Sequence, residues 1–162
     1  MKVLLQAFLP LNIYGDSKMG TNENKTYDCL KLENQLCFPL YAASREILRK
    51  YTPLLKPLDL TYTQYIVLMV LWEHKEMTVG ELGKKLILDT GTLSPLLKSM
   101  EKKNLIARSR AKEDERIVTV KITEQGMALK EPASEIPAKM GACLNLSKEE
   151  AETLYKILYK II

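Results

Sequence analysis

Thiols and imidazoles, which serve as nucleophiles and as zinc ligands, are few in this sequence. There are three cysteines, Cys29, Cys37 and Cys143, and one histidine, His74. An odd number of irregularly spaced cysteines is not the pattern of a secreted disulfide framework, so we expect a reducing, cytoplasmic environment. Dispersed cysteines and a single histidine also lack the ligand spacing of a zinc site. We therefore expect no metal and no other cofactor.

Cys37 lies among leucines in the stretch KLENQLCFPLYAASREILRKYTPLL. Apolar residues recur there at helical intervals until Pro53 and Pro57, which predicts an amphipathic helix over residues 32–55. A cysteine thiolate on such a helix is a nucleophile. However, a free cysteine is among the most buried residue types and often only fills space. Periodicity alone favours this packing role.

The length and composition indicate one ordinary soluble domain. The chain has 162 residues, 46% hydrophobic and 27% charged, with a net charge of +4. This charge neither establishes nor opposes a nucleic-acid partner. The initial run MKVLLQAFLPLNIYG is broken by Gln6 and Pro10, lacks a signal-peptide cleavage site and is too short to span a bilayer. We expect no membrane partner, and we interpret residues 1–30 as a flexible N-terminal extension.

The middle of the chain predicts two helices joined by a tight turn. TYTQ at residues 61–64 opens a helix as a capping box, and TVGE at residues 78–81 opens a shorter one that ends near Leu86. LDTGT then supplies turn formers around Gly91. The apolar stripe of the helix after this turn consists of Leu93, Leu96, Leu97 and Met100. This is a helix-turn-helix pattern, although ordinary helical hairpins share it.

The segments LIARSR and RIVTVKIT flank the polar tip AKEDE. Residues alternate with period two on both sides of the tip, which predicts a β-hairpin. A helix-turn-helix followed directly by a charged hairpin is the element order of a winged helix. The expected fold class is therefore α+β, mostly α.

The C-terminal part of the chain predicts further helices. Thr123 is expected to cap one of them, which Pro132 and Pro137 weaken. SKEE at residues 147–150 is another capping box. The stripe of this last helix consists of Leu154, Ile157, Leu158 and Ile161. A terminal helix this apolar needs a covering surface. We therefore expect residues 31–162 to form a winged-helix domain that dimerises through 31–60 and 124–162 and binds DNA through 61–123.

The predicted DNA-facing surface combines one helix face with the hairpin. Hydroxyls and lysines opposite the apolar stripe can contact phosphates and base edges in a major groove. The residues of this helix expected to contact DNA are Thr90, Thr92, Ser94, Pro95, Lys98 and Lys102. In the hairpin, Arg108 adds positive charge, Asp114 is expected to brace the wing by pairing with an arginine, and Arg116 to enter a minor groove. A solvated helix face and a solvated charged turn are the alternatives.

Four stretches, LENQLCFPLYAASRE, LTYTQYIVLMVLWEH, LDTGTLSPLLKSMEKKNLI and RAKEDERIVTVKITEQG, resemble the MarR family of winged-helix regulators, specifically its organic-hydroperoxide-resistance branch. They occur in the family's order between Lys31 and Gly126. The resemblance implies a homodimeric repressor of pseudo-palindromic double-stranded operator DNA, and not an enzyme. The family's wing arginine and its partner acid match Arg116 and Asp114.

The resemblance also implies that organic hydroperoxides are the effector and that they oxidise Cys37, which lies in the QLCF motif. Tyr51 and Tyr62 of the other subunit match the tyrosines that hydrogen-bond the thiolate in such proteins, and this bonding favours the reactive anion. Cys143 lies at about the place of a second cysteine in some relatives, so we hypothesise an intersubunit disulfide with Cys37. Cys29 is expected to be incidental, although it could also resolve a sulfenic acid.

Three other functions are compatible with this sequence. The first is a MarR-type regulator that binds a small aromatic or lipid ligand in the dimer crevice, with Cys37 secondary. The second is a thiol peroxidase, since the same thiolate reduces peroxide, although a basic wing would be superfluous in such an enzyme. The third is a purely structural dimerisation module.

Overall fold

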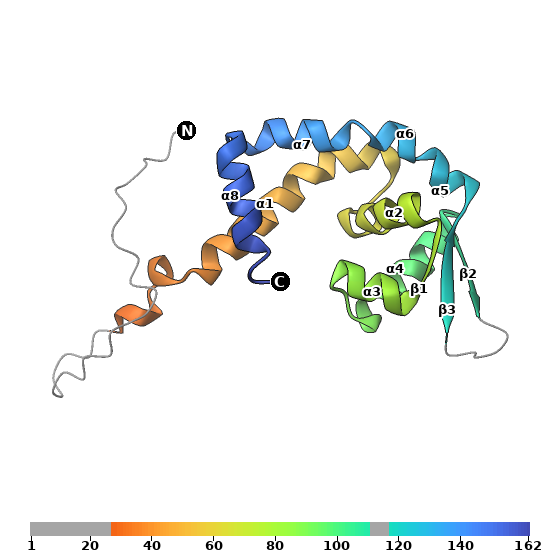
Figure 1. The fold of residues 1–162 in the computed structure, drawn as a ribbon, viewed down its shortest axis with the longest axis horizontal. Coiled ribbons are helices and arrows are strands. Elements are labelled where there is room, and N and C mark those ends of the chain that lie inside the picture. Colours follow the sequence, from red (N-terminus) through yellow and green to blue (C-terminus); the bar gives the residue numbers. More distant parts are fainter. Residues whose placement is uncertain (1–26, 111–116) are drawn as a thin grey trace. The chain divides into compact units, whose positions relative to one another are not determined.

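The computed structural model describes residues 27–110 and 117–162 of the chain. Two compact units are distinguished, and their boundary in the sequence lies between Ile47 and Leu48. The described part of the first unit contains two short turns and the start of a helix (Figure 1). Asp114 and Arg116 of the predicted wing lie outside the described residues.

Two 3-10 turns precede the first α-helix. The elements are η1 (Asp28–Leu30), η2 (Leu32–Asn34) and α1 (Cys37–Leu55). The prediction that the helix begins at Leu32 is wrong. Asn34 Nδ2 donates to the carbonyl oxygen of Asp28 at 2.8 Å, and Gln35 Nε2 donates to that of Cys29. Such bonds from side chains to nearby carbonyls compete with helix formation, so α1 begins only after these turns; it ends at Leu55, as predicted.

A winged helix follows α1. Its elements are η3 (Lys56–Leu58), α2 (Tyr62–His74), β1 (Glu76–Thr78), α3 (Val79–Leu86), α4 (Thr90–Lys102), β2 (Ile106–Arg110) and β3 (Val118–Ile122). Both predicted capping boxes are confirmed. Thr61 and Gln64 exchange side-chain bonds with each other's backbone N–H at the start of α2, and Thr78 and Glu81 do so at the start of α3.

The turn between α3 and α4 differs from the prediction. Gly91 lies inside α4, whose N-cap is Asp89. The chain reverses at Ile87, which has the left-handed φ of 55°. The glycine that this turn requires is Gly83, because a Cβ there would lie 2.8 Å from the carbonyl oxygen of Leu88. The helix-turn-helix is therefore confirmed, but its turn depends on another glycine.

The three strands form an antiparallel sheet in the order β1-β3-β2. The predicted hairpin of β2 and β3 is confirmed, with Arg108 opposite Val120. β1 was not predicted; its Met77 pairs with Val120 from the other side. α2 and α3 pack on this sheet and on α4 (Figure 1). The α+β, mostly α class is therefore confirmed.

Most of the buried hydrophobic side chains lie in the winged helix. The predicted inward stripe of α4 is buried at Leu93, Leu97 and Met100, and half-buried at Leu96. Other fully buried side chains include Val67, Leu68, Leu71, Leu82 and Val120. This packing holds α4 with its opposite face in solvent.

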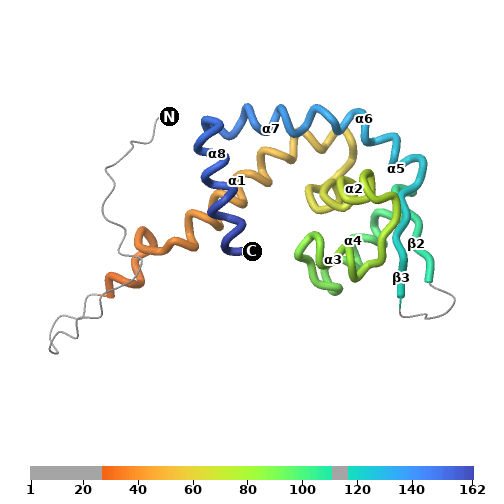
Figure 2. Tube along the Cα trace, viewed as in Figure 1, coloured from red at the N-terminus to blue at the C-terminus, as the bar shows by residue number. Residues whose placement is uncertain are grey.

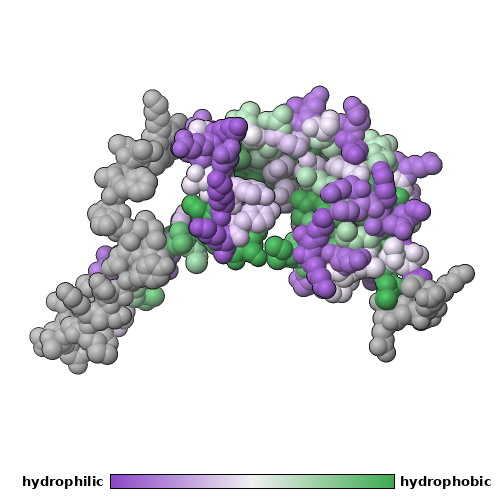
Figure 3. All heavy atoms as spheres, viewed as in Figure 1, coloured by the Kyte–Doolittle hydropathy of each residue, from purple (hydrophilic) through white to green (hydrophobic). Residues whose placement is uncertain are grey.

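Helices after the hairpin follow one another along the chain (Figure 2). They are α5 (Glu124–Ala128), α6 (Lys130–Ala133), α7 (Ile136–Leu144) and α8 (Lys148–Leu158). The predicted caps at Thr123 and Ser147 are confirmed. α8 has no buried residue. Hydrophilic side chains line its face in Figure 3, and its exposed apolar residues include Leu154, Tyr155 and Ile157.

Within the described residues, no helix is both long and apolar enough to cross a membrane. The same ranges contain no group of three histidine, cysteine or acidic side chains arranged to hold a metal ion.

Candidate nucleic-acid interface

The second helix of the helix-turn-helix, α4, presents the side chains predicted to contact DNA. Those exposed to solvent are Thr90, Thr92, Pro95, Lys98 and Lys102, and Ser94 is half-buried. The hydroxyl of Ser94 donates to the carbonyl oxygen of Thr90 at 2.8 Å. The two lysines lie four positions apart, so they share one side of the helix.

Asp89 fixes the start of α4. Its carboxylate accepts hydrogen bonds from the backbone N–H of Thr92 at 2.9 Å and from the Thr92 hydroxyl at 2.7 Å. These bonds, with the hydroxyl contributing most, hold the pKa of Asp89 below its usual range. The cap therefore stays ionised at neutral pH, which suits the positive end of the helix dipole.

The hairpin is braced on α4 by an ion pair that the sequence did not reveal. Arg108 Nη2 and Nε lie 2.6 and 3.1 Å from Glu101 Oε2, and the Arg108 backbone N–H donates to Glu101 Oε1 at 3.2 Å. These contacts hold the pKa of Glu101 below its usual range. Arg108, predicted to face DNA, therefore joins the wing to the last turn of α4.

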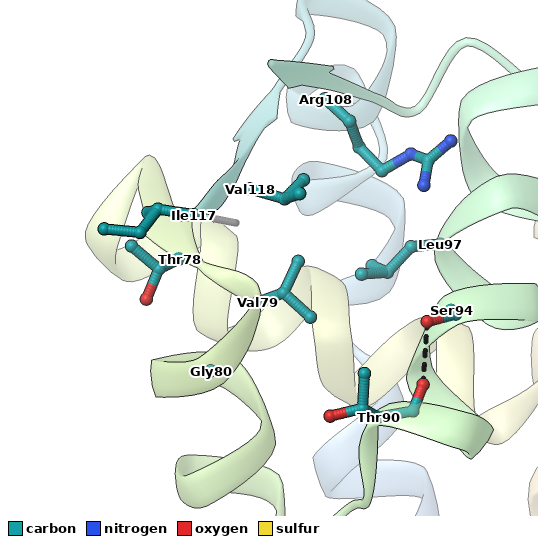
Figure 4. Close-up of a pocket in the computed structure, with 9 residues that line it drawn as sticks. All are labelled: Thr78, Val79, Gly80, Thr90, Ser94, Leu97, Arg108, Ile117 and Val118. Atoms are coloured by element: carbon teal, nitrogen blue, oxygen red, sulfur yellow. Dashed lines mark hydrogen bonds between the residues drawn. The ribbon is translucent and has the colours of Figure 1, made fainter. Parts of the chain in front are cut away.

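A hollow of about 440 Å³ lies between the wing and the two helices of the motif. Figure 4 shows Val79, Leu97 and Val118 lining it, with Arg108 reaching toward α4 beside it. The apolar lining comes from α3, α4 and β3. The Glu101–Arg108 contact joins the hairpin to α4 beside this hollow.

Three tyrosines form a cluster between α1 and α2. The ring centroids of Tyr51 and Tyr62 are 4.7 Å apart, and Tyr51 and Tyr65 are 6.0 Å apart. Tyr65 in turn lies 6.1 Å from Trp72. Burial raises the pKa of Tyr51 and of Tyr62 above the usual value. Their phenolic groups therefore keep their protons at neutral pH and can donate hydrogen bonds.

The cysteines occupy different elements. Cys37 is the first residue of α1, Cys143 lies near the end of α7, and both are exposed, as is Cys29 in η1. The carbonyl oxygen of Cys143 accepts a hydrogen bond from Lys50 Nζ at 3.1 Å. Lys50 directly precedes Tyr51, so this bond brings Cys143 beside the stretch of α1 that carries the tyrosine cluster.

Two contacts connect residues 59–64, around Tyr62, to α4 and to Lys103, the residue directly after this helix. Gln64 Nε2 is 3.4 Å from Ser99 Oγ. Lys103 Nζ donates to the carbonyl oxygen of Asp59 at 2.5 Å and lies 2.9 Å from its carboxylate. Asp59 lies between α1 and α2, and Gln64 is in the first turn of α2 beside Tyr62. The first turn of α2 and the preceding loop are thus fastened to α4, and sequence patterns had not indicated either bond.

A helix-turn-helix whose second helix exposes hydroxyls and lysines, followed by a hairpin, defines a winged-helix DNA-binding protein. Residues 49–132 match the family described as transcriptional regulator SarA/Rot. Over 135 residues, the chain is 53% identical to the organic hydroperoxide resistance transcriptional regulator of Bacillus subtilis (strain 168). The aligned region covers 83% of this chain and 89% of that protein. The chain belongs to the MarR family of winged-helix transcriptional regulators, in its organic-hydroperoxide-resistance branch.

Solved structures agree with this assignment. Reduced AbfR bound to DNA has a TM-score of 0.68 and 33% identity, covering 80% of this chain and 91% of that one. AbfR, a Staphylococcus epidermidis protein, also matches in a disulfide-formed structure, with a TM-score of 0.60, 32% identity and the same coverage. A MarR mutant from E. coli complexed with operator DNA has a TM-score of 0.70 and 28% identity, covering 78% and 93%. This chain is therefore a transcriptional regulator that binds DNA, and not an enzyme.

Proposed function

We propose that this chain is a homodimeric repressor that leaves its operator when an organic hydroperoxide oxidises Cys37. The name of the Bacillus subtilis relative supports the effector, and the reduced, DNA-bound and disulfide-formed structures of AbfR support redox control. The observation that carries the proposal is the packing of Tyr51 against Tyr62, whose ring centroids are 4.7 Å apart. Phenolic hydroxyls are hydrogen-bond donors suited to a thiolate.

The thiolate that these phenols bind comes from a second copy of the chain. In the organic-hydroperoxide-resistance regulators that this chain resembles, the tyrosines of one subunit bond the cysteine of the other, so we assign each tyrosine pair to the partner's Cys37. We assign dimerisation to residues 31–60 and 124–162, because α8 exposes an apolar face that a second copy would cover.

The sensing reaction is a two-electron oxidation of sulfur. The Cys37 thiolate attacks one peroxide oxygen, the O–O bond breaks, and the organic part leaves as an alkoxide that takes up a proton to become an alcohol. The resulting sulfenic acid no longer offers the phenols a full negative charge. Cys143 of the partner then displaces hydroxide from that sulfur and forms an intersubunit disulfide. The Lys50–Cys143 bond supports this step, because a Cys37 that reaches the partner's Tyr51 also approaches its Cys143.

We attribute the release of DNA to the contacts that connect the surroundings of Tyr62 with α4. Loss of the phenol–thiolate bonds changes the position of Tyr62, and the Gln64–Ser99 and Lys103–Asp59 contacts carry this change to α4. A dimer binds two half-sites only when its two recognition helices are spaced to match them. Oxidation therefore weakens binding by changing this spacing.

The DNA contacts that we propose are divided between the helix and the wing. Thr90, Thr92, Ser94, Pro95, Lys98 and Lys102 face a major groove, in a DNA-binding region of residues 61–123. Arg116 enters the adjacent minor groove and Asp114 steadies it. The operator is double-stranded and pseudo-palindromic, because a two-fold dimer presents two equal heads.

The test is fluorescence anisotropy of DNA from the chain's own promoter, titrated with cumene hydroperoxide in the presence of wild type or Cys37→Ser. The proposal predicts release of wild type and retention of Cys37→Ser. Release of both proteins, or of neither, would contradict it.

One observation favours a second function, control by a bound ligand. Tyr65, Met69 and Trp72 of α2 line a hollow of about 340 Å³ together with residues of α6 and α7. This is large enough for a small aromatic molecule. Release of DNA from Cys37→Ser by a simple aromatic acid such as benzoate would support this function, and benzoate without effect on both proteins would argue against it.

A further inference from the structure

The residues between Cys29 and Cys37 fold back on themselves. Gln35, two positions before Cys37, donates a side-chain hydrogen bond to the carbonyl oxygen of Cys29 and lies 3.4 Å from that of Lys31. Asn34 makes the same kind of bond to Asp28. Cys29 is thereby held near the start of α1, where Cys37 is the first helical residue.

The turns that hold Cys29 can rearrange at little cost. Neither η1 nor η2 contains a buried residue, and both cysteines are exposed. The ion pair between Lys31 and Asp28, at 2.6 Å, joins side chains that are more than half exposed. Exposed pairs of this kind contribute little stability. Shifting Cys29 to the Cα separation of about 4.4–6.8 Å that a disulfide needs therefore disturbs no core.

Proximity in sequence gives Cys29 a further advantage. Only seven residues separate it from Cys37, and closing so short a flexible loop gives an effective thiol concentration on the order of millimolar or higher. A thiol on the same chain also remains available when a partner's cysteine is misaligned or already modified.

We propose that Cys29 is a resolving thiol that acts within its own chain, giving a Cys29–Cys37 disulfide beside the intersubunit one. This rests on the proposed oxidation of Cys37. The Cys29 thiolate attacks the sulfur of the Cys37 sulfenic acid, the S–S bond forms, the S–O bond breaks, and hydroxide leaves and is protonated to water. The hydroperoxide has already accepted the two electrons, so no further oxidant is required.

The test uses the full-length Cys143→Ser protein, which lacks the intersubunit route. The reduced protein is treated with cumene hydroperoxide, blocked with N-ethylmaleimide and digested with trypsin without reductant. Trypsin cuts after Lys31, so Cys29 and Cys37 fall on separate peptides that only a disulfide joins. A parallel reaction contains dimedone, which traps sulfenic acid. The matched control is Cys29→Ser/Cys143→Ser.

In Cys143→Ser we expect the Cys29 and Cys37 peptides to be joined by a disulfide, and the protein to run as a monomer on a non-reducing gel. Dimedone labelling of Cys37 should be about tenfold lower in this protein than in Cys29→Ser/Cys143→Ser. Equal dimedone labelling of the two proteins, with Cys29 still alkylated, would overturn the role of Cys29 and leave the proposed function intact. Failure of peroxide to modify Cys37 in either protein would overturn both. These two outcomes differ in the label on Cys37. A Cys37 that was never oxidised carries N-ethylmaleimide, whereas an unresolved sulfenic acid carries dimedone.

Discussion

The change of Tyr62 to phenylalanine tests the tyrosine site most directly. It removes one hydroxyl and keeps the ring that packs 4.7 Å from Tyr51. A hydrogen bond to a charged group contributes about 1.5–3 kcal/mol. Because Tyr62 is only half-buried, the lower end of this range applies. About 1.5 kcal/mol corresponds to about a tenfold change, so Cys37 should be oxidised about tenfold more slowly at pH 7.

The assay follows the loss of the Cys37 thiol after mixing with cumene hydroperoxide, in a Cys29→Ser/Cys143→Ser background with a single cysteine. Tyr65→Phe is the matched control, because Tyr65 belongs to the same cluster but is not assigned to the thiolate, and its rate should stay within about twofold of the background. Thermal unfolding of each variant checks that the fold is kept. An unchanged rate in folded Tyr62→Phe, or an equally slow Tyr65→Phe, would refute the assignment.

Three further predictions concern stability and DNA binding. Gly126→Ala should lower the free energy of unfolding by about 1–3 kcal/mol or more, measured by urea denaturation, because the new Cβ would overlap the carbonyl oxygen of Leu105. The bonds from Arg108 depress the pKa of Glu101, so their stabilisation is present above the ordinary carboxyl pKa of 4.5 and is lost as the pH falls through the lower folded value. Thermal unfolding between neutral pH and pH 3 should therefore show a smaller loss of stability for Glu101→Gln than for wild type. Lys98→Ala should remove about one phosphate contact and so weaken the salt dependence of operator binding. In anisotropy titrations, the magnitude of the slope of log K against log salt should decrease by about 0.9.

Local signals in the sequence were sufficient for most helix starts. The capping boxes at Thr61, Thr78 and Ser147 each involve residues three positions apart, so sequence spacing predicts them directly. β1 was missed because three residues carry no usable period, and it exists only through pairing with β3. The turn at Ile87 was missed because a branched residue in the left-handed region follows no sequence rule.

In the candidate site, too, local sequence patterns predict some residues and miss those that depend on contacts between elements. The exposed face of α4 follows from helical period, and the roles of Cys37, Tyr51 and Tyr62 came from the family resemblance. Glu101 was missed, because its bond to Arg108 crosses from a helix to a strand. Such contacts depend on the angle between two elements, which short-range patterns do not encode.

The fastening of α4 at Ser99 and Lys103 has a consequence in the opposite direction, from DNA to sulfur. Coupling between two sites is reciprocal in free energy. If oxidation lowers the affinity for the operator by a given factor, the operator must shift the equilibrium between the oxidised and reduced forms of Cys37 toward the reduced form by that same factor. Under the proposed function, a bound promoter therefore stabilises the reduced form of Cys37, and unbound copies of the regulator lack this stabilisation.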